Sequence, residues 1–106
     1  MSKKIKVMIS QPMRGKTNEQ IRQERAELVK RLEKDNFEVV DTIISENAPK
    51  SCNEAIYYLS KSIEFISKVD IVYFMKNWKK ARGCRIENKI CQDYGKQTMY
   101  NIYEEE

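Results

Sequence analysis

The chain has 106 residues, of which 41% are hydrophobic and 34% charged, a composition that predicts one soluble, folded domain over residues 1–106. A net charge of +4 and a sequence pI of about 8.9 are modest for a general nucleic-acid-binding protein. No apolar run approaches the ~20 residues that a membrane helix needs, and no signal peptide is visible, so we expect a cytoplasmic protein.

The sequence contains no histidine, which excludes His-based zinc sites, Ser-His-Asp triads and Cys-His dyads. We predict no metal site and no cofactor, and any acid–base chemistry falls to carboxylates, Tyr, Lys or Cys. The cysteines are odd in number and lack a paired short spacing. We therefore expect reduced, buried thiols at Cys52, Cys84 and Cys91.

The hydrophobic pattern predicts strands alternating with helices along the whole chain. Capping boxes at 17–20 (TNEQ) and 51–54 (SCNE) mark the starts of two helices, and Gly95 marks the end of a third. In chain order we predict a strand at 4–9, a loop at 10–16, a helix to near 36, a strand at 37–41, a loop at 42–50, a helix from 51, a strand at 69–75, a loop at 76–80, a helix at 81–94 and a strand at 97–102. The acidic residues 104–106 are expected to be frayed and solvated.

This alternation predicts an α/β fold with a parallel sheet covered by helices on both faces. We expect a small doubly wound sheet, Rossmann-like or flavodoxin-like, of about four strands in the order 2-1-3-4. In such sheets ligands bind outside the carboxyl ends of the strands, at the point where the strand order reverses. Here that point lies between the first and third strands.

Basic residues gather in the two loops that follow those strands, and neither loop contains an acidic residue. Helix N-termini lie directly behind both loops and favour anions. The pattern predicts a site for an anionic small molecule, with phosphate the natural choice. The alternative is ordinary surface lysine. The basic residues are Arg14, Lys16, Lys76, Lys79, Lys80 and Arg82.

Other residues near these loops allow two interpretations each. Gly15 and Gly83 either let the backbone approach a ligand closely or serve as plain turn glycines. Trp78 either covers a nucleobase or packs on the surface, whereas Tyr73 is expected in the core. Arg25 falls on the apolar face of the first helix, where its side chain either snorkels to the sheet edge or reaches the anion.

Glu87 is the most informative residue of the sequence. At ~100° per residue it falls within the apolar arc formed by Ile86, Ile90, Cys91 and Tyr94. One interpretation is an ion pair with a cation such as Arg14 or Arg82. The other is a catalytic carboxylate, nucleophile or base, held ionised by the helix N-terminus and nearby cations. Cys84 has no histidine to activate it, so we assign it to packing.

Three segments carry a resemblance to a known family: VMISQPMRGKTNEQI at 7–21, YYLSKSIEFISKVDIVYFMKNW at 57–78 and ARGCRIENKICQDYGK at 81–96. The chain resembles the nucleoside 2-deoxyribosyltransferase-like superfamily, and is most similar to its short phage and bacterial DUF4406-like members. The resemblance implies that Glu87 attacks the anomeric carbon of a deoxyribosyl group and expels the base. Arg14-Gly15, with Ser10 nearby, is similar to the 5'-phosphate loop of deoxynucleoside 5'-monophosphate N-hydrolases, and Asp70 is similar to a structural Asp.

The chain departs from the active enzymes at two positions where they carry Asp. Ser62 stands eight residues before Asp70, and Ala81 stands six residues before Glu87. The acid that protonates the leaving base is therefore not identified. Asp41, Tyr57 and Tyr58 are the candidates, and the sequence does not select among them.

We expect an enzyme acting on the N-glycosidic bond of a (deoxy)nucleotide or nucleotide-sugar compound, by hydrolysis or transfer, with Glu87 as nucleophile. The alternative is a non-catalytic protein that senses or sequesters a nucleotide. The modest charge and acidic tail argue against a nucleic-acid-binding module. We expect a homodimer or higher homo-oligomer, with Met13, Tyr57 and Tyr58 as contacts. The expected ligand-binding residues are Ser10, Arg14, Gly15, Lys16, Trp78, Arg82 and Gly83.

Overall fold

The computed structural model describes residues 3–44 and 46–104, and it confirms the predicted alternation of strands and helices. The boundaries differ from the predicted ones by a few residues, mostly at strand ends. In chain order the elements are β1 (Ile5–Ser10), α1 (Asn18–Lys34), β2 (Phe37–Val39), α2 (Glu54–Lys68), β3 (Ile71–Phe74), the short 3₁₀ helix η1 (Trp78–Lys80), α3 (Arg82–Tyr94) and β4 (Gln97–Tyr100).

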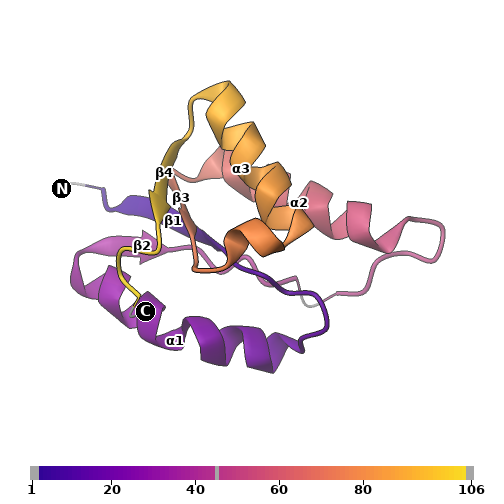
Figure 1. Cartoon of the computed structure of the whole chain (residues 1–106), viewed down its shortest axis with the longest axis horizontal. Helices are drawn as coiled ribbons and strands as arrows, with labels where there is room; N and C mark the ends of the chain where they lie inside the picture. The colour runs from indigo at the N-terminus through magenta and orange to yellow at the C-terminus, as the bar shows by residue number, and fades with distance from the viewer. Residues whose placement is uncertain (1–2, 45, 105–106) are drawn as a thin grey trace.

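The four strands form one parallel sheet in the order β2-β1-β3-β4, as predicted. Helix α1 covers one face, and α2 and α3 cover the other (Figure 1). In the central pair, Val7 lies opposite Ile71 and Ser10 opposite Phe74. The carboxyl ends of β1 and β3 therefore meet at one edge, where the sequence places its two basic loops.

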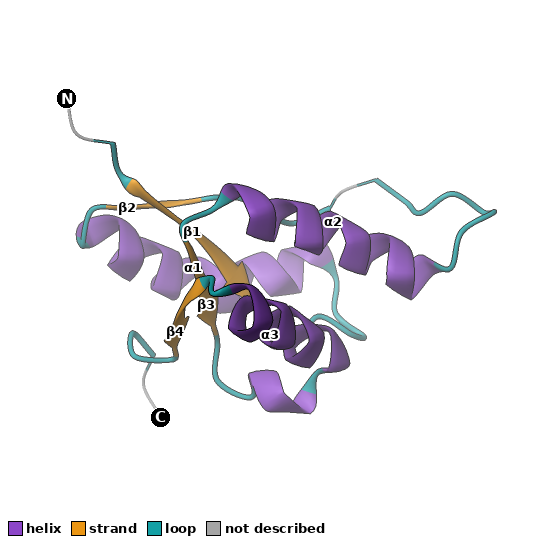
Figure 2. Cartoon of the chain, turned by 90° about the horizontal axis from the view of Figure 1, so that it is seen from above, coloured by secondary structure: helices purple, strands orange, loops and turns teal. Residues whose placement is uncertain are grey.

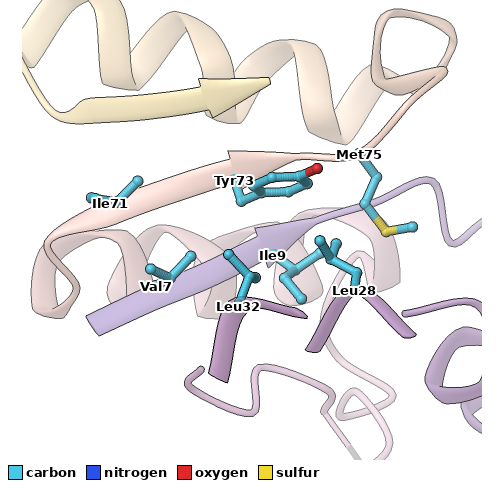
Figure 3. Packing of buried hydrophobic residues seen from close by; sticks show 7 residues of the cluster. All are labelled: Val7, Ile9, Leu28, Leu32, Ile71, Tyr73 and Met75. Atoms are coloured by element: carbon cyan, nitrogen blue, oxygen red, sulfur yellow. The ribbon is translucent and has the colours of Figure 1, made fainter. Parts of the chain in front are cut away.

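Alternate residues of the central strands point to opposite faces of the sheet. Val7 and Ile9 of β1 and Tyr73 of β3 pack with Leu28 and Leu32 of α1 (Figure 3). Residues on the other face, toward α2 and α3, include Met8, Val72 and Phe74, which cluster with Ile66 and Cys91. The pattern has a direct consequence at the end of β1, because Ser10 and the following Gln11 leave the strand on different sides.

Local signals account for the helix ends. Thr17 forms the predicted capping box: its hydroxyl accepts from the Gln20 amide at 3.1 Å, and the Gln20 side chain accepts from the Thr17 amide at 2.8 Å. The second predicted box, at Ser51, is wrong. Asn53 caps α2 instead by accepting from the Ile56 amide at 3.0 Å, since Asn is an equally good N-cap. Gly95 ends α3 in the left-handed conformation with φ 70°.

Three further expectations need correction. Tyr94 is 85% exposed rather than part of the apolar face of α3, and Cys52 is exposed, while Cys84 and Cys91 are buried as predicted. Glu104 is not solvated tail: its carboxylate accepts from the Tyr73 hydroxyl at 2.9 Å and from the Lys76 amide at 3.1 Å. The reason is that the hydroxyl of a buried tyrosine requires a polar partner. Residues 105–106 lie outside the described part of the chain.

Helix α2 is attached more loosely than the others. Its N-terminal half and the preceding loop project beyond the sheet (Figure 2), and Ile56 and Ile63 are exposed on it. Its C-terminal end is anchored, because Ile66 packs in the core beside α3.

At the start of β3 the Asp70 carboxylate accepts from the Lys6 amide at 2.8 Å, which ties β3 to β1. Over residues 3–44 and 46–104, no helix has the length and apolar character needed to cross a membrane.

Candidate active site

Glu87 lies in the second turn of α3 and points at the sheet rather than at solvent. Only 7% of its surface is exposed. Ser10, the last residue of β1, is also buried, and its hydroxyl donates to Glu87 Oε1 at 2.6 Å. The predicted inward orientation of Glu87 is thereby confirmed. Its carboxyl group lies at the carboxyl end of a central strand, on the face covered by α2 and α3.

Two other side chains lie near this carboxyl group. Ser62 of α2 is close enough for its hydroxyl to affect the pKa of Glu87, and Cys84, one turn earlier in α3, lies close to both Ser10 and Glu87. Segments from β1, α2 and α3 therefore converge on one acid. Ser62 occupies the position where the resemblance implies an aspartate, and the structure places it beside Glu87.

The electrostatics of Glu87 differ from the prediction. Burial raises its pKa, and the hydrogen bonds from Ser10 and Ser62 only partly oppose this effect. The expectation that cations hold Glu87 ionised, and the alternative of an ion pair with Arg14 or Arg82, are both wrong. Among the described residues no cation forms an ion pair with Glu87, and both arginines are exposed. Burying an arginine beside Glu87 would cost several kcal/mol of desolvation.

The neighbouring thiols are poor nucleophiles. Burial, together with the charge of Glu87, raises the pKa of Cys84 and of Cys91 to about 11. Since the thiolate is the reactive form, neither cysteine is activated at neutral pH. The assignment of Cys84 to packing therefore agrees with its surroundings. Within the residues that the structure describes, no group of three Cys, Asp or Glu side chains is arranged to hold a metal ion.

The predicted phosphate loop leaves β1 directly after Ser10. A turn closed by the Lys16 amide and the Met13 carbonyl (3.1 Å) exposes Arg14 and Gly15 at its tip. Gly15 has φ 78°, and a Cβ there would touch nothing within 4 Å, so the glycine is required by the backbone conformation and not by space. Lys16 is engaged elsewhere: its Nζ forms an ion pair with Glu24 at 2.9 Å.

The second basic loop leads into α3. Arg82 and Gly83 are exposed in the first helical turn, one turn before Glu87. Trp78 is half-buried, with its ring centroid 5.2 Å from that of Phe74 and 5.6 Å from that of Tyr100. These contacts are those of a side chain that packs over the β3–β4 end of the core. Of the predicted ligand-binding residues, only Ser10 forms a side-chain hydrogen bond with Glu87 among the described residues.

Two of the three candidate acids for the leaving base, Asp41 and Tyr58, have other partners. Partial burial acts to raise the pKa of Asp41, but hydrogen bonds from the Ile43 amide and Arg22 outweigh it and lower the pKa. Asp41 faces α1, where Arg22 Nη1 approaches it at 3.1 Å. The Tyr58 hydroxyl bridges the Glu46 carbonyl and the Ala48 amide within the loop before α2. Neither residue is described in contact with Glu87.

Sequence reasoning missed the residues that fasten the phosphate loop to α1. Gln11 and Arg25 are buried and hydrogen-bonded to each other, with Glu24 beside them. The available signal was Arg25, a charged residue on the apolar face of a helix. Its partner could not be read from the pattern, because Gln11 belongs to a loop.

Residues 5–100 match the model of a protein family described as a domain of unknown function, DUF4406. No curated protein matches the chain, and no solved structure matches it.

Proposed function

The chain belongs to the DUF4406 family, and from that premise we propose that its site cleaves or transfers at the N-glycosidic bond of a (deoxy)nucleotide or nucleotide-sugar compound. The observation that supports this function is a carboxyl group buried at the carboxyl end of β1, held by a serine hydroxyl and not by a cation. The resemblance to the nucleoside 2-deoxyribosyltransferase-like superfamily supplies the chemistry.

In the proposed reaction, Glu87 attacks the anomeric carbon of the sugar. A bond forms between a carboxylate oxygen and that carbon while the bond to the base breaks, and the electron pair leaves with the base nitrogen, which takes a proton from solvent. The Ser10 hydroxyl, which donates to Oε1, holds the carboxyl group in place. Water, or a second base, then displaces the glycosyl group from Glu87.

The loops around the site fit the phosphate of such a ligand. Arg14 and Gly15 form the exposed tip of the loop after β1, and Arg82 and Gly83 form the exposed start of α3. Among the described residues, neither Arg14 nor Arg82 forms an ion pair with a carboxylate, so both guanidinium groups are available to a phosphate. In the proposal Lys16, held at the end of the first loop by its ion pair with Glu24, borders the phosphate, and Trp78 borders the base.

The test is release of free base from a panel of deoxynucleoside 5'-monophosphates and nucleotide-sugar compounds. Wild type should release base, and Glu87→Ala and Glu87→Gln should lose about 10³-fold or more of that rate, since each removes the nucleophile. Glu64→Gln, which changes an exposed glutamate of α2, is the matched control and should retain the rate. Equal background rates in wild type and Glu87→Ala across the panel would contradict the catalytic proposal.

A second candidate function is nucleotide binding without turnover. It is favoured by Ser62 and Ala81, which stand where the resemblance implies aspartates. Titration calorimetry with the same compounds, followed by analysis of the recovered ligand, separates the two functions. Tight binding with an unchanged ligand supports a binding protein, whereas a lack of heat with every phosphorylated nucleoside removes both candidates.

A further inference from the structure

The loop that follows Ser10 is fastened to α1 by buried polar side chains on the face of the sheet opposite Glu87. Gln11, the first residue of this loop, is 4% exposed, and Arg25, in the second turn of α1, is 5% exposed. Arg25 Nε donates to Gln11 Oε1 at 2.5 Å. The contact holds the backbone at the residue immediately after Ser10.

Glu24 fastens both ends of the same loop. Its Oε1 accepts from Gln11 Nε2 at 3.3 Å and from Lys16 Nζ at 2.9 Å, and Gln11 Nε2 also donates to the Ile21 carbonyl. One carboxylate therefore joins the first and last residues of the segment 11–16. Only the tip between them remains without such contacts.

Stability alone gives a weak reason for this arrangement. Arg25 Nη2 is buried and makes no hydrogen bond, and burial lowers the pKa of the guanidinium to about 10 although the charge of Asp41 opposes the effect. An apolar side chain of similar length would fill the same space without the desolvation cost. A buried polar group that is expensive to keep and only partly satisfied calls for a role beyond packing.

We propose that Gln11, Glu24 and Arg25 are positioning residues, which hold the loop 11–16 so that its Arg14-Gly15 tip keeps one arrangement beside Ser10 and thereby binds the nucleotide phosphate. The proposal rests on the proposed function, because it names the part of the ligand that the loop receives. The physical gain is preorganisation: a loop already ordered loses less conformational entropy when the phosphate binds.

The test compares Arg25→Met with Arg22→Met. The first variant removes the bond to Gln11 and keeps an unbranched side chain in the space, while the second removes an exposed arginine of the same helix that pairs with Asp41. Three quantities are measured on the full chain: the urea midpoint, hydrogen exchange of the Lys16 amide, which donates to the Met13 carbonyl, and the affinity for deoxyadenosine monophosphate.

Arg25→Met should keep or raise the urea midpoint, speed exchange of the Lys16 amide by about tenfold, and weaken nucleotide binding by a similar factor. Arg22→Met should leave the exchange and the affinity as in wild type. If exchange at Lys16 is equal in Arg25→Met and wild type, the positioning role is overturned. If wild type binds no nucleotide while exchange still responds, the proposed function fails and with it the ligand assigned to the loop.

Glu24→Gln keeps the proposal testable if Arg25→Met does not fold. The Glu24 side chain is partly exposed, so its amide replacement does not disturb the core, yet it weakens the attachment of Lys16. We expect faster exchange of the Lys16 amide in this variant than in wild type. Unchanged exchange at this amide overturns the role assigned to Glu24.

Discussion

Consecutive residues at the end of β1 serve two different buried charged groups, one on each face of the sheet. Ser10 reaches Glu87 on the face covered by α2 and α3, and Gln11 reaches Arg25 on the face covered by α1. Glu87 and Arg25 are almost equally buried, at 7% and 5% exposed. The fold therefore keeps an acid and a base apart across the sheet, each with a neutral side chain as its partner.

The same arrangement has opposite chemical consequences on the two faces. Burial disfavours the charged form of each group, so it raises the pKa of Glu87 and lowers that of Arg25 to about 10. The pKa of Glu87 therefore lies above that of an exposed carboxyl group. Arg25 remains charged at neutral pH. One face thus holds a carboxyl group that binds its proton more tightly than in water, and the other holds a fixed charge suited to anchoring.

Reversing the charge on the α1 face gives the largest expected effect. Arg25→Glu removes the donor to Gln11 and buries a carboxylate within electrostatic reach of Asp41. We expect a loss of about 3–5 kcal/mol in the free energy of unfolding at pH 7, measured by urea denaturation.

The control for this variant is Arg22→Glu, which reverses an exposed charge one turn away on the same helix. It should cost about 1 kcal/mol or less, because exposed ion pairs contribute little. If Arg25→Glu costs no more than this control, the α1 face does not exclude water from Arg25 and the comparison between the faces fails.

A smaller effect is expected in the pH dependence of the free energy of unfolding, and it comes from Glu87 on the face covered by α2 and α3. Glu87 binds its proton more tightly in the folded chain than in the unfolded chain, where its pKa is about 4.3. The stability of wild type relative to Glu87→Gln is therefore greatest below that pH and falls as pH rises through the folded pKa. This difference in the free energy of unfolding can change by about 1.4 kcal/mol per pH unit for one proton.

Urea denaturation of both proteins from pH 3 to 8 measures this difference, and the same series on Glu64→Gln corrects for the loss of an exposed carboxylate. If the stability of wild type relative to Glu87→Gln increases as pH rises, the pKa of Glu87 is not raised in the folded chain. It would mean that a cation or further donors stabilise the ionised carboxylate in solution.

The periodicity of the sequence predicted those features of the two faces that depend on one helix or one strand alone. The strand–helix alternation predicted a parallel sheet, the common order of doubly wound sheets supplied the strand order, and the 3.6-residue period predicted the inward direction of Glu87. The same period failed at Tyr94, which ends α3 and is exposed. A helical wheel assigns a side but not the length of sheet that lies beneath the helix.

The partners of the buried groups could not be predicted, because they come from distant segments. Ser10 and Glu87 are 77 positions apart, and no pattern in either segment specifies that one residue serves the other. The expected cationic partner followed from the rule that buried charges are paired. The chain satisfies Glu87 with hydroxyl groups instead, and composition does not distinguish the two solutions.

The smallest expected effect concerns the outer attachment of the loop. Lys16 and Glu24 form an ion pair whose side chains are 33% and 43% exposed, so Lys16→Met should change the free energy of unfolding by about 1 kcal/mol or less. Adding 1 M salt to wild type should give a change of the same sign, because salt screens exposed pairs. A loss well above 1 kcal/mol in urea denaturation would show that the loop is held mainly through Lys16. The buried contact of Arg25 with Gln11 would then be the weaker of the two attachments, and the α1 face would anchor the loop from the solvent side rather than from the core.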